Sequence, residues 1–421
     1  MSSAGPDKAA PESSRLLRAV FGATFFVRFA FGITLAVFAS YILGRSTGLS
    51  GNDYGVVGLV AAMAPVGEFS TVLFSGVASD RVGRFPVLFA GMVVAAALFA
   101  LVSLTRSTVA LGAMNFIFGI ASGAILASSL AVIADRSVEA ERGLEMGRFD
   151  AVNLAGWLGG FAFGIGILAL VQAGQLPISS LPYVFVLGAL ALLAGLLLAW
   201  FLVRGVPLAA PVRANPVGQI FRSAFRRSVL LVTLPWLVVY MLIGYVLVFV
   251  GSAATGTGFP LSYIAAGIGG GGFLLVISQP RFGRLADRYG RTRLMTIGVG
   301  GFVGVLTSAS LLVAFGPLPE LLAALALSAA GALAYGPAAL AALADLAFEL
   351  SRATTMAIYS LTISLGMILG LIVGTQLVDH FGNDGYYLFF SGIAVALVGL
   401  TVARYRDLRA PLSPVPTTPA R

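Results

Sequence analysis

The sequence contains no cysteine and only one histidine, His380. Without cysteine the chain can form no disulfide, no thiolate nucleophile and no cysteine-ligated metal site. One histidine cannot build a metal cluster, so we expect no metal site and interpret His380 as a surface residue. No Walker-type phosphate loop and no nucleophile–base arrangement is found in the sequence, so we expect no cofactor and no enzymatic activity.

Charged residues are also scarce. They make up 10% of the 421 residues, whereas an average soluble protein is about a quarter charged. Hydrophobic residues make up 58% of the chain. Apolar runs of roughly 20 residues recur along it, and this is the length that a helix needs to cross a bilayer. The sequence therefore predicts an all-α membrane protein.

The apolar runs predict twelve transmembrane helices. They lie near residues 17–43, 54–79, 86–105, 108–134, 148–172, 181–203, 229–250, 260–281, 294–315, 320–346, 354–378 and 386–403. An even number of spans places both termini on the same side of the membrane. Arg28 falls in a span and Arg45 and Arg106 fall in loops on the opposite side, whereas every other lysine and arginine falls on the side of the termini.

This charge distribution predicts the orientation of the protein. Cytoplasmic loops carry an excess of lysine and arginine, so both termini are expected in the cytoplasm and the protein in the plasma (cytoplasmic) membrane. The net charge of +9 is explained by this bias, so we expect no nucleic-acid partner.

The spans divide the chain into five segments. We predict a disordered cytoplasmic tail over residues 1–16, a first six-helix bundle over 17–203, a cytoplasmic linker over 204–228, a second six-helix bundle over 229–403 and a cytoplasmic tail over 404–421. The linker contains arginines and no acidic residue, which favours contact with lipid headgroups.

A nine-residue motif occurs once in each half, between two predicted spans. The first copy reads Gly76-Val-Ala-Ser-Asp80-Arg81-Val-Gly83-Arg84, and the second reads Gly283-Arg-Leu-Ala-Asp287-Arg288-Tyr-Gly290-Arg291. Gly83 and Gly290 permit a sharp turn in the backbone. The aspartates can cap a helix N-terminus and pair with nearby arginines.

A second set of residues repeats in the same way. Asp135, Arg142, Met146, Gly156, Gly160 and Gly164 recur, each 210 positions later (135 to 345), as Asp345, Arg352, Met356, Gly366, Gly370 and Gly374. Two independent repeats indicate that the halves arose by duplication. The sequence therefore predicts two pseudo-symmetric six-helix bundles, a plan known among secondary transporters.

Together, the two motif copies and twelve spans resemble the major facilitator superfamily over roughly residues 17–404. The resemblance implies transport of a small solute by alternating access. It also implies that the motif residues form a cytoplasmic gate, which latches the two halves in the outward-facing state; these residues are Gly76, Asp80, Arg81, Gly83, Arg84, Gly283, Asp287, Arg288, Gly290 and Arg291. The alternative is that these charges only set the topology.

The sequence departs from the family pattern at two points. Many proton-coupled members carry an arginine early in the fourth span, where this chain reads Asn115-Phe-Ile-Phe-Gly119. Drug exporters of the family carry a proline in the fifth span, where this chain reads Ala155-Gly-Trp-Leu-Gly-Gly160. Both departures make the chain less similar to a typical drug–proton antiporter.

Two ionisable residues lie well inside predicted spans. Arg28 is about 11 residues after the start of the first span, which at 1.5 Å per residue puts it roughly 16 Å deep. Glu68 is about 11 residues before the end of the second span, at the same depth. An isolated charge there would cost about 2.5–3.5 kcal/mol, so the two are expected to face a common cavity. We predict a pair that binds a proton or substrate; the alternative is a static ion pair.

Three further residues are candidates for the same cavity. Asn115 and Asn153 could line it, with Trp157 as an aromatic wall, although asparagines in spans can equally well join helices by hydrogen bonds. Asp150 is expected to pair with loop arginines instead.

These observations favour a secondary active transporter that is coupled to protons through Glu68. The alternatives are a passive facilitator of the same fold, a drug-efflux protein and a non-transporting membrane sensor. Arg28 favours an anionic solute, whereas the aromatic and aliphatic span faces favour an amphipathic one. We expect the protein to be a monomer that contacts membrane lipids.

Overall fold

The computed structural model of the chain describes residues 6–45, 54–137, 142–172, 174–206, 227–253, 272–316, 318–346, 352–381, 384 and 391–397. Within these ranges the protein consists of helices joined by short turns, without strands.

The first half contains six long helices. They are α1 (Pro6–Arg45), α2 (Tyr54–Val82), α3 (Arg84–Val102), α4 (Thr108–Arg136), α5 (Arg142–Gln172) and α6 (Leu181–Val203), with a short 3-10 helix η2 (Ile178–Ser180) before α6. Each long helix corresponds to one predicted span, although α3 ends at Val102, three residues before the predicted end of the third span.

The start of α1 differs from the prediction. Residues 6–16 are helical where the sequence predicted disorder, and residues 1–5 lie outside the described part. Leu16 is buried in the core, and the Arg15 guanidinium donates a hydrogen bond of 3.3 Å to the carbonyl oxygen of Arg204, just after α6. These contacts anchor the end of the predicted tail to the bundle.

The second half contains α8 (Arg227–Ala253), α10 (Gly272–Tyr289), α11 (Arg291–Phe315), α12 (Pro319–Ala332), α13 (Tyr335–Leu346) and α14 (Arg352–Phe381). Residues 391–397, in the last predicted span, are also helical. Most of the predicted linker 204–228 and the whole predicted tail 404–421 lie outside the described residues.

The tenth predicted span is broken into α12 and α13. The break precedes Pro337, which has no N–H to donate to the carbonyl four residues earlier. At the break the Tyr335 side chain is fully buried, and its hydroxyl donates a hydrogen bond of 2.7 Å to the Val232 carbonyl of α8.

Eight stretches of the described residues are long and apolar enough to cross a membrane, by length and composition. Two shorter apolar stretches, Val232–Gly244 and Ile358–Gly374, lie in α8 and α14. Large apolar side chains are exposed on the outer helices α3 and α6, as at Val93 and Leu197, where a bilayer would surround them.

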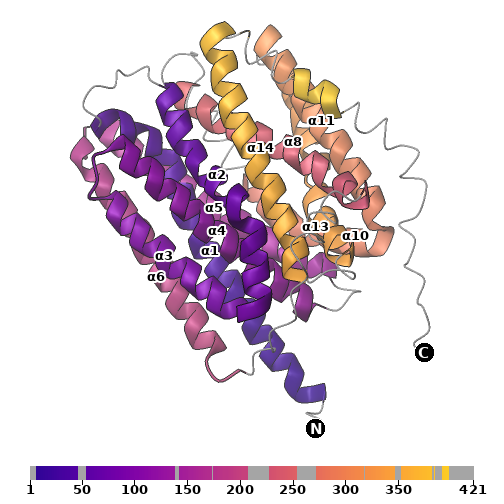
Figure 1. Cartoon of the computed structure of the whole chain (residues 1–421). Coiled ribbons are helices and arrows are strands. Elements are labelled where there is room, and N and C mark those ends of the chain that lie inside the picture. The colour runs from indigo at the N-terminus through magenta and orange to yellow at the C-terminus, as the bar shows by residue number, and fades with distance from the viewer. Residues whose placement is uncertain are drawn as a thin grey trace.

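The two halves lie side by side (Figure 1), with the first half drawn in indigo to magenta and the second in orange to yellow. Within each half the helices pack closely, for example α1 with α5 and α6, and α8 with α14. Between the halves, α2 packs against α14 and α5 packs against α10. We call this contact between α2 and α5 of one half and α10 and α14 of the other the seam.

Repeated glycines bring equivalent helices together in both halves. A Cβ atom at Gly156 or Gly160 of α5 would overlap carbonyl oxygens of α1. A Cβ atom at Gly366 or Gly370 of α14 would overlap carbonyl oxygens of α8 in the same way. The small residues therefore allow the same close helix approach in each bundle.

Candidate functional site

The two motif turns have the same backbone geometry. Gly83 and Gly290, with φ of 114° and 94°, lie at the starts of α3 and α11. Their N–H groups donate hydrogen bonds of 3.1 Å to the carbonyls of Ser79 and Ala286. Only glycine adopts such positive φ values without strain, which explains why both turns carry it. We call the end of the molecule that contains these turns the motif end.

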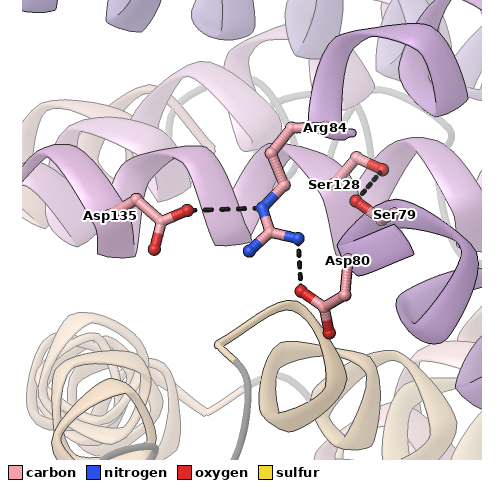
Figure 2. A network of polar contacts seen from close by, with 5 residues as sticks. All are labelled: Ser79, Asp80, Arg84, Ser128 and Asp135. Atoms are coloured by element: carbon pink, nitrogen blue, oxygen red, sulfur yellow. Dashed lines mark hydrogen bonds and ion pairs between the residues drawn. The ribbon is translucent and has the colours of Figure 1, made fainter. Parts of the chain in front are cut away.

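The first motif copy forms a network of polar contacts (Figure 2). Arg84 lies between two acidic residues, paired with Asp80 at the end of α2 and, at 3.3 Å, with Asp135 at the end of α4. Beside it, the Ser128 hydroxyl donates a hydrogen bond of 3.0 Å to Ser79. One arginine thus holds three helices of the first half together at the motif end.

The second copy repeats this arrangement. Arg291 pairs with Asp287 of α10 at 3.7 Å and with Asp345 of α13. It also donates a hydrogen bond of 3.0 Å to the Ala341 carbonyl. Arg291, Asp287 and Asp345 are the repeat equivalents of Arg84, Asp80 and Asp135, so each half carries one arginine between two aspartates.

Asp287 also reaches across the seam. Its carboxylate oxygens accept hydrogen bonds of 3.1 Å from the backbone N–H groups of Gly143 and Leu144, at the start of α5. These N–H groups have no partner within the helix, and the positive end of the helix dipole favours a carboxylate there. Burial raises the pKa of Asp287, an effect that the two N–H groups and Arg291 oppose.

The remaining motif residues differ in their surroundings. Gly76 is buried in α2, and a Cβ atom at Gly283 would overlap the carbonyl of Gly143 on α5. Arg81 and Arg288 are exposed, and the Arg288 guanidinium lies 5.3 Å from the ring centroid of Tyr289. The glycines are therefore placed for close packing and the two exposed arginines for contact with solvent or lipid.

A cavity lies between the two halves. The first half lines it with Arg28, Phe31, Ala64, Pro65, Glu68, Phe118, Gly119, Ser122, Asn153, Leu154 and Trp157. The second half lines it with Tyr240, Ile243, Ile363 and Met367. Both ionisable residues predicted near the membrane midplane therefore open into one space, and both come from the first half.

Arg28 is held by a neighbouring helix. Its Nε donates a hydrogen bond of 2.7 Å to the Asn153 side chain of α5, and its guanidinium lies 5.9 Å from the centroid of the Phe31 ring. Among the described residues Arg28 and Glu68 form no ion pair. The two ionisable groups therefore lie in one cavity and interact electrostatically without forming an ion pair.

Glu68 is buried where α2 meets α4 and α14. On α4 a Cβ atom at Gly123 would lie 3.0 Å from the Glu68 Cγ, so the glycine leaves space for this side chain. On α14 the carboxyl group faces Ser360 and Ser364. Its Oε1 has no hydrogen-bond partner. The carboxyl group is thus in contact with both halves and retains an acceptor that a proton or solute could use.

Four of the five predicted cavity residues come together. Trp157 lines the cavity beside Asn153 and stacks on Phe161 at 6.2 Å. Asn115 does not join them, because its Nδ2 donates a hydrogen bond of 2.8 Å to the Val60 carbonyl, and it lines a separate, smaller cavity. Asn115 therefore joins α4 to α2, which is the alternative role considered for asparagines in spans.

Sequence reasoning did not single out the second-half residues of the site. Tyr240 lines the cavity, and its hydroxyl lies 3.4 Å from that of Tyr359. Ser360 and Ser364 are four residues apart and lie on one face of α14. The only sequence signal was their polarity within an apolar span, which many serines and tyrosines in membrane helices share.

In the part of the chain that the structure describes, Asp150 does not pair with the loop arginines that the sequence predicted as its partners. Its side chain is buried on the second-half side of α5, and within the described ranges it forms no ion pair. Arg148, the nearest arginine along the chain, is exposed and pairs with Glu145. Asp150 faces the seam because it lies on the same side of α5 as Asn153, three residues away.

Comparisons with known proteins identify the family. The family model described as Major Facilitator Superfamily matches residues 20–306 and again residues 273–420. A triacylglyceride transporter of Mycolicibacterium smegmatis is 30% identical over 154 residues. That match spans 35% of this chain and 24% of the relative, so the chain matches about a quarter of that protein's length.

Solved structures agree in fold. The human organic anion transporter MFSD10 (TETRAN) superposes with a TM-score of 0.71 at 17% identity, covering 92% of this chain and 99% of that one. The proton:xylose symporter XylE bound to 6-bromo-6-deoxy-D-glucose superposes with a TM-score of 0.68 at 15% identity. The superposition covers 94% of this chain and 96% of that one.

These matches confirm the predicted all-α fold of twelve transmembrane helices in two bundles. They also agree with the absence of a predicted enzymatic function, since the family consists of transporters of small solutes. The chain therefore belongs to the major facilitator superfamily and is a multi-pass integral membrane transporter.

Proposed function

We propose that the protein is a secondary active transporter that moves a small organic solute bearing an anionic group, coupled to protons through Glu68. The observation that carries this proposal is the cavity between the halves, which is lined by both Arg28 and Glu68. A guanidinium binds carboxylate and phosphate groups well. A buried carboxyl group that contacts both halves can exchange a proton as the halves move.

The apolar lining determines what else the solute must offer. Phe31, Phe118 and Trp157 face the cavity together with Ile243 and Met367, so an amphipathic body fits beside the anionic group. The similar proteins are transporters of organic anions, of xylose with protons and of triacylglycerides, and these solutes differ widely in polarity.

We further propose that the motif end faces the cytoplasm, in the plasma membrane, and that the protein acts as a monomer of two bundles with a cytoplasmic linker and tails. Asp287 on the start of α5 and the close contact of Gly283 with Gly143 then form the cytoplasmic gate. In the conformation of this structure, the two halves are in contact at the motif end, so the proposed gate is closed.

The same transport measurement distinguishes this proposal from two alternative functions. A passive facilitator would use Arg28 and Glu68 only to position helices, and would equilibrate solute without concentrating it. A drug exporter would respond to cationic or neutral amphipathic compounds rather than to anions.

The experiment uses purified protein in liposomes loaded with a pH-sensitive dye. A panel of organic anions, neutral sugars and amphipathic cations is added under an imposed pH gradient. We expect a subset of the anions to produce a proton flux in the wild-type protein that is lost in Glu68→Gln. A saturable flux of solute that never changes the internal pH would establish the passive facilitator instead.

A further inference from the structure

Asp150 is a buried acidic residue that the proposed mechanism does not use. It lies in α5 about one helical turn from Asn153, toward the motif end. Its side chain is enclosed by helices of the other half. A Cβ atom built at Gly336 of α13 would lie 2.8 Å from its Oδ2, 3.3 Å from Gln279 Oε1 and 3.6 Å from Trp236.

Among the described residues, no cationic side chain forms an ion pair with this carboxyl group. From α10 it faces Gln279, from α13 Gly336 and from α8 Trp236, none of which titrates. In the part of the chain that the structure describes, the hydroxyls of Tyr240 on α8 and Tyr359 on α14 interact electrostatically with Asp150.

The nearby arginines are engaged elsewhere. On α1, the Arg28 Nε donates to Asn153, and on α5 itself Arg148 pairs with Glu145 outside the seam. A carboxylate buried without a cation is strongly unfavourable, whereas a neutral carboxylic acid is tolerated when a polar group such as an amide lies beside it. The closed seam therefore favours the protonated form of the Asp150 carboxyl group.

The side chain of Asp150 is closely packed against α13. Asp150 does not line the cavity that holds Arg28 and Glu68, and even a methyl group on Gly336 would collide with it. A solute or a hydrated cation would have to separate α5 from α13. If α5 moves away from α10 and α13, water reaches the carboxyl group and the charged form becomes favourable.

We propose that Asp150 is a second proton site of this transporter, which holds a proton while the seam is closed and releases it to water at the motif end when the seam opens. The step breaks one O–H bond and leaves a carboxylate and a hydrated proton. The proposal deepens the proposed function, since it rests on alternating access but not on coupling through Glu68. It predicts that the seam opens more readily as the pH rises.

The test measures the distance across the motif end. Val82 and Tyr289 are exposed at equivalent positions of the two motif copies, one in each half. Because the chain has no cysteine, Val82→Cys and Tyr289→Cys allow nitroxide labels at only these two sites. Pulsed dipolar spectroscopy in lipid nanodiscs, without any solute, then records the distance distribution between about pH 5.5 and about pH 8.5.

In the otherwise wild-type protein we expect a population at longer distance to grow as the pH rises. Asp150→Asn keeps the shape of the protonated acid but cannot ionise, so most of the pH response of its distance distribution should be lost. Asp150→Ser, which is smaller, provides the same readout if the amide does not fold. A wild-type distribution that ignores pH, or a variant that keeps the wild-type response, would overturn the proposal.

Two matched variants separate Asp150 from the other acids. Asp287→Asn removes the titratable group at the motif end of the seam, and Glu68→Gln removes the one in the cavity. Glu68→Gln should retain the full pH response of the distance, and Asp287→Asn should lose only the smaller part that the gate contributes. If the response disappears only in Asp287→Asn, the proton is held at the gate and the assignment to Asp150 is wrong. Loss of proton flux in Glu68→Gln with an intact distance response would support both proposals independently.

Discussion

The two halves are most alike at the motif end and most different in the cavity. Arg84 between Asp80 and Asp135 matches Arg291 between Asp287 and Asp345. In the cavity, by contrast, the first half contributes two charged side chains, whereas the second contributes one hydroxyl and three apolar side chains.

This contrast separates two roles. Opening and closing of the seam moves both halves, so each half needs its own arginine between two aspartates. Recognition of a solute needs only one set of charges, and a second set would have to be desolvated without a partner. Duplication followed by loss or gain of charges in one half explains the pattern, and mutations in the two regions should therefore have different consequences.

The largest effect is expected at Glu68. Glu68→Gln retains the shape of the side chain but cannot carry a proton, so accumulation of solute driven by a pH gradient should be abolished while exchange of solute continues. Glu320→Gln is the matched control, because Glu320 is an exposed acid at the start of α12. Uptake in liposomes measures both, and full accumulation by Glu68→Gln would mean that the cavity acid is structural.

The next largest effect is expected at Arg28. A hydrogen bond between charged groups contributes about 1.5–3 kcal/mol, so Arg28→Ala should raise the KM for an anionic solute about 10- to 100-fold. Tyr240→Phe removes only a neutral hydroxyl from the second half and should raise it about fivefold. Equal effects of the two substitutions on KM would contradict the assignment of recognition to the first half.

Substitutions in the two motif aspartates should have smaller and similar effects. Asp80→Ala and Asp287→Ala should slow transport while leaving folding intact. For Asp287, loss of a helix cap of about 0.5–2 kcal/mol shifts the closed state by about 2- to 30-fold. Asp287→Asn keeps an acceptor and should recover most of the rate. Wild-type transport rates in both alanine variants would remove the gate from the mechanism.

The pH dependence of this gate has a definite sign. Because burial in the closed seam raises the pKa of Asp287, closing the seam favours uptake of a proton at this residue. Its contribution to the closed state is therefore greatest in acid and is lost as the pH rises through the raised pKa. Comparing Asp287→Asn with the wild-type protein in distance measurements at acidic pH isolates this contribution.

The smallest effect is expected at the turn glycines. Alanine at Gly83 or Gly290 would have to adopt positive φ at a cost of about 1–2 kcal/mol, which corresponds to a fall in Tm of a few degrees, about 2–4 °C for each kcal/mol. Gly166→Ala is the control, because this helical glycine has open space around it and the alanine should be neutral or stabilising. A large difference between Gly83→Ala and Gly290→Ala would show that the two turns are not equivalent.

The sequence was sufficient for the fold because its signals are repeated. Long apolar runs predicted the spans, and two sets of residues at constant offsets predicted the duplication. Helix rise predicted that Arg28 and Glu68 lie at a similar level, and the structure places both in one cavity.

The partners of buried polar residues could not be predicted in the same way. Asn115 and Asn153 are both asparagines in spans, but only Asn153 lies beside Arg28, because Gly156 and Gly160 bring α5 onto α1. Asp150 lies close along the chain to arginines, yet the rotation of α5 turns it toward the second half. Such outcomes depend on which faces of two helices meet, and periodicity alone does not determine this.

Because Asp287 caps α5, hydrogen exchange of two backbone amides can report the opening of the seam. The N–H groups of Gly143 and Leu144 can exchange their hydrogens with solvent only when the carboxylate leaves them. Their deuterium uptake therefore reports the separation of α10 from α5, even when no solute is present. At a pH where chemical exchange is faster than reclosing, the exchange rate of these two amides equals the rate of separation. If every transport cycle includes one such separation, this rate is an upper limit on turnover.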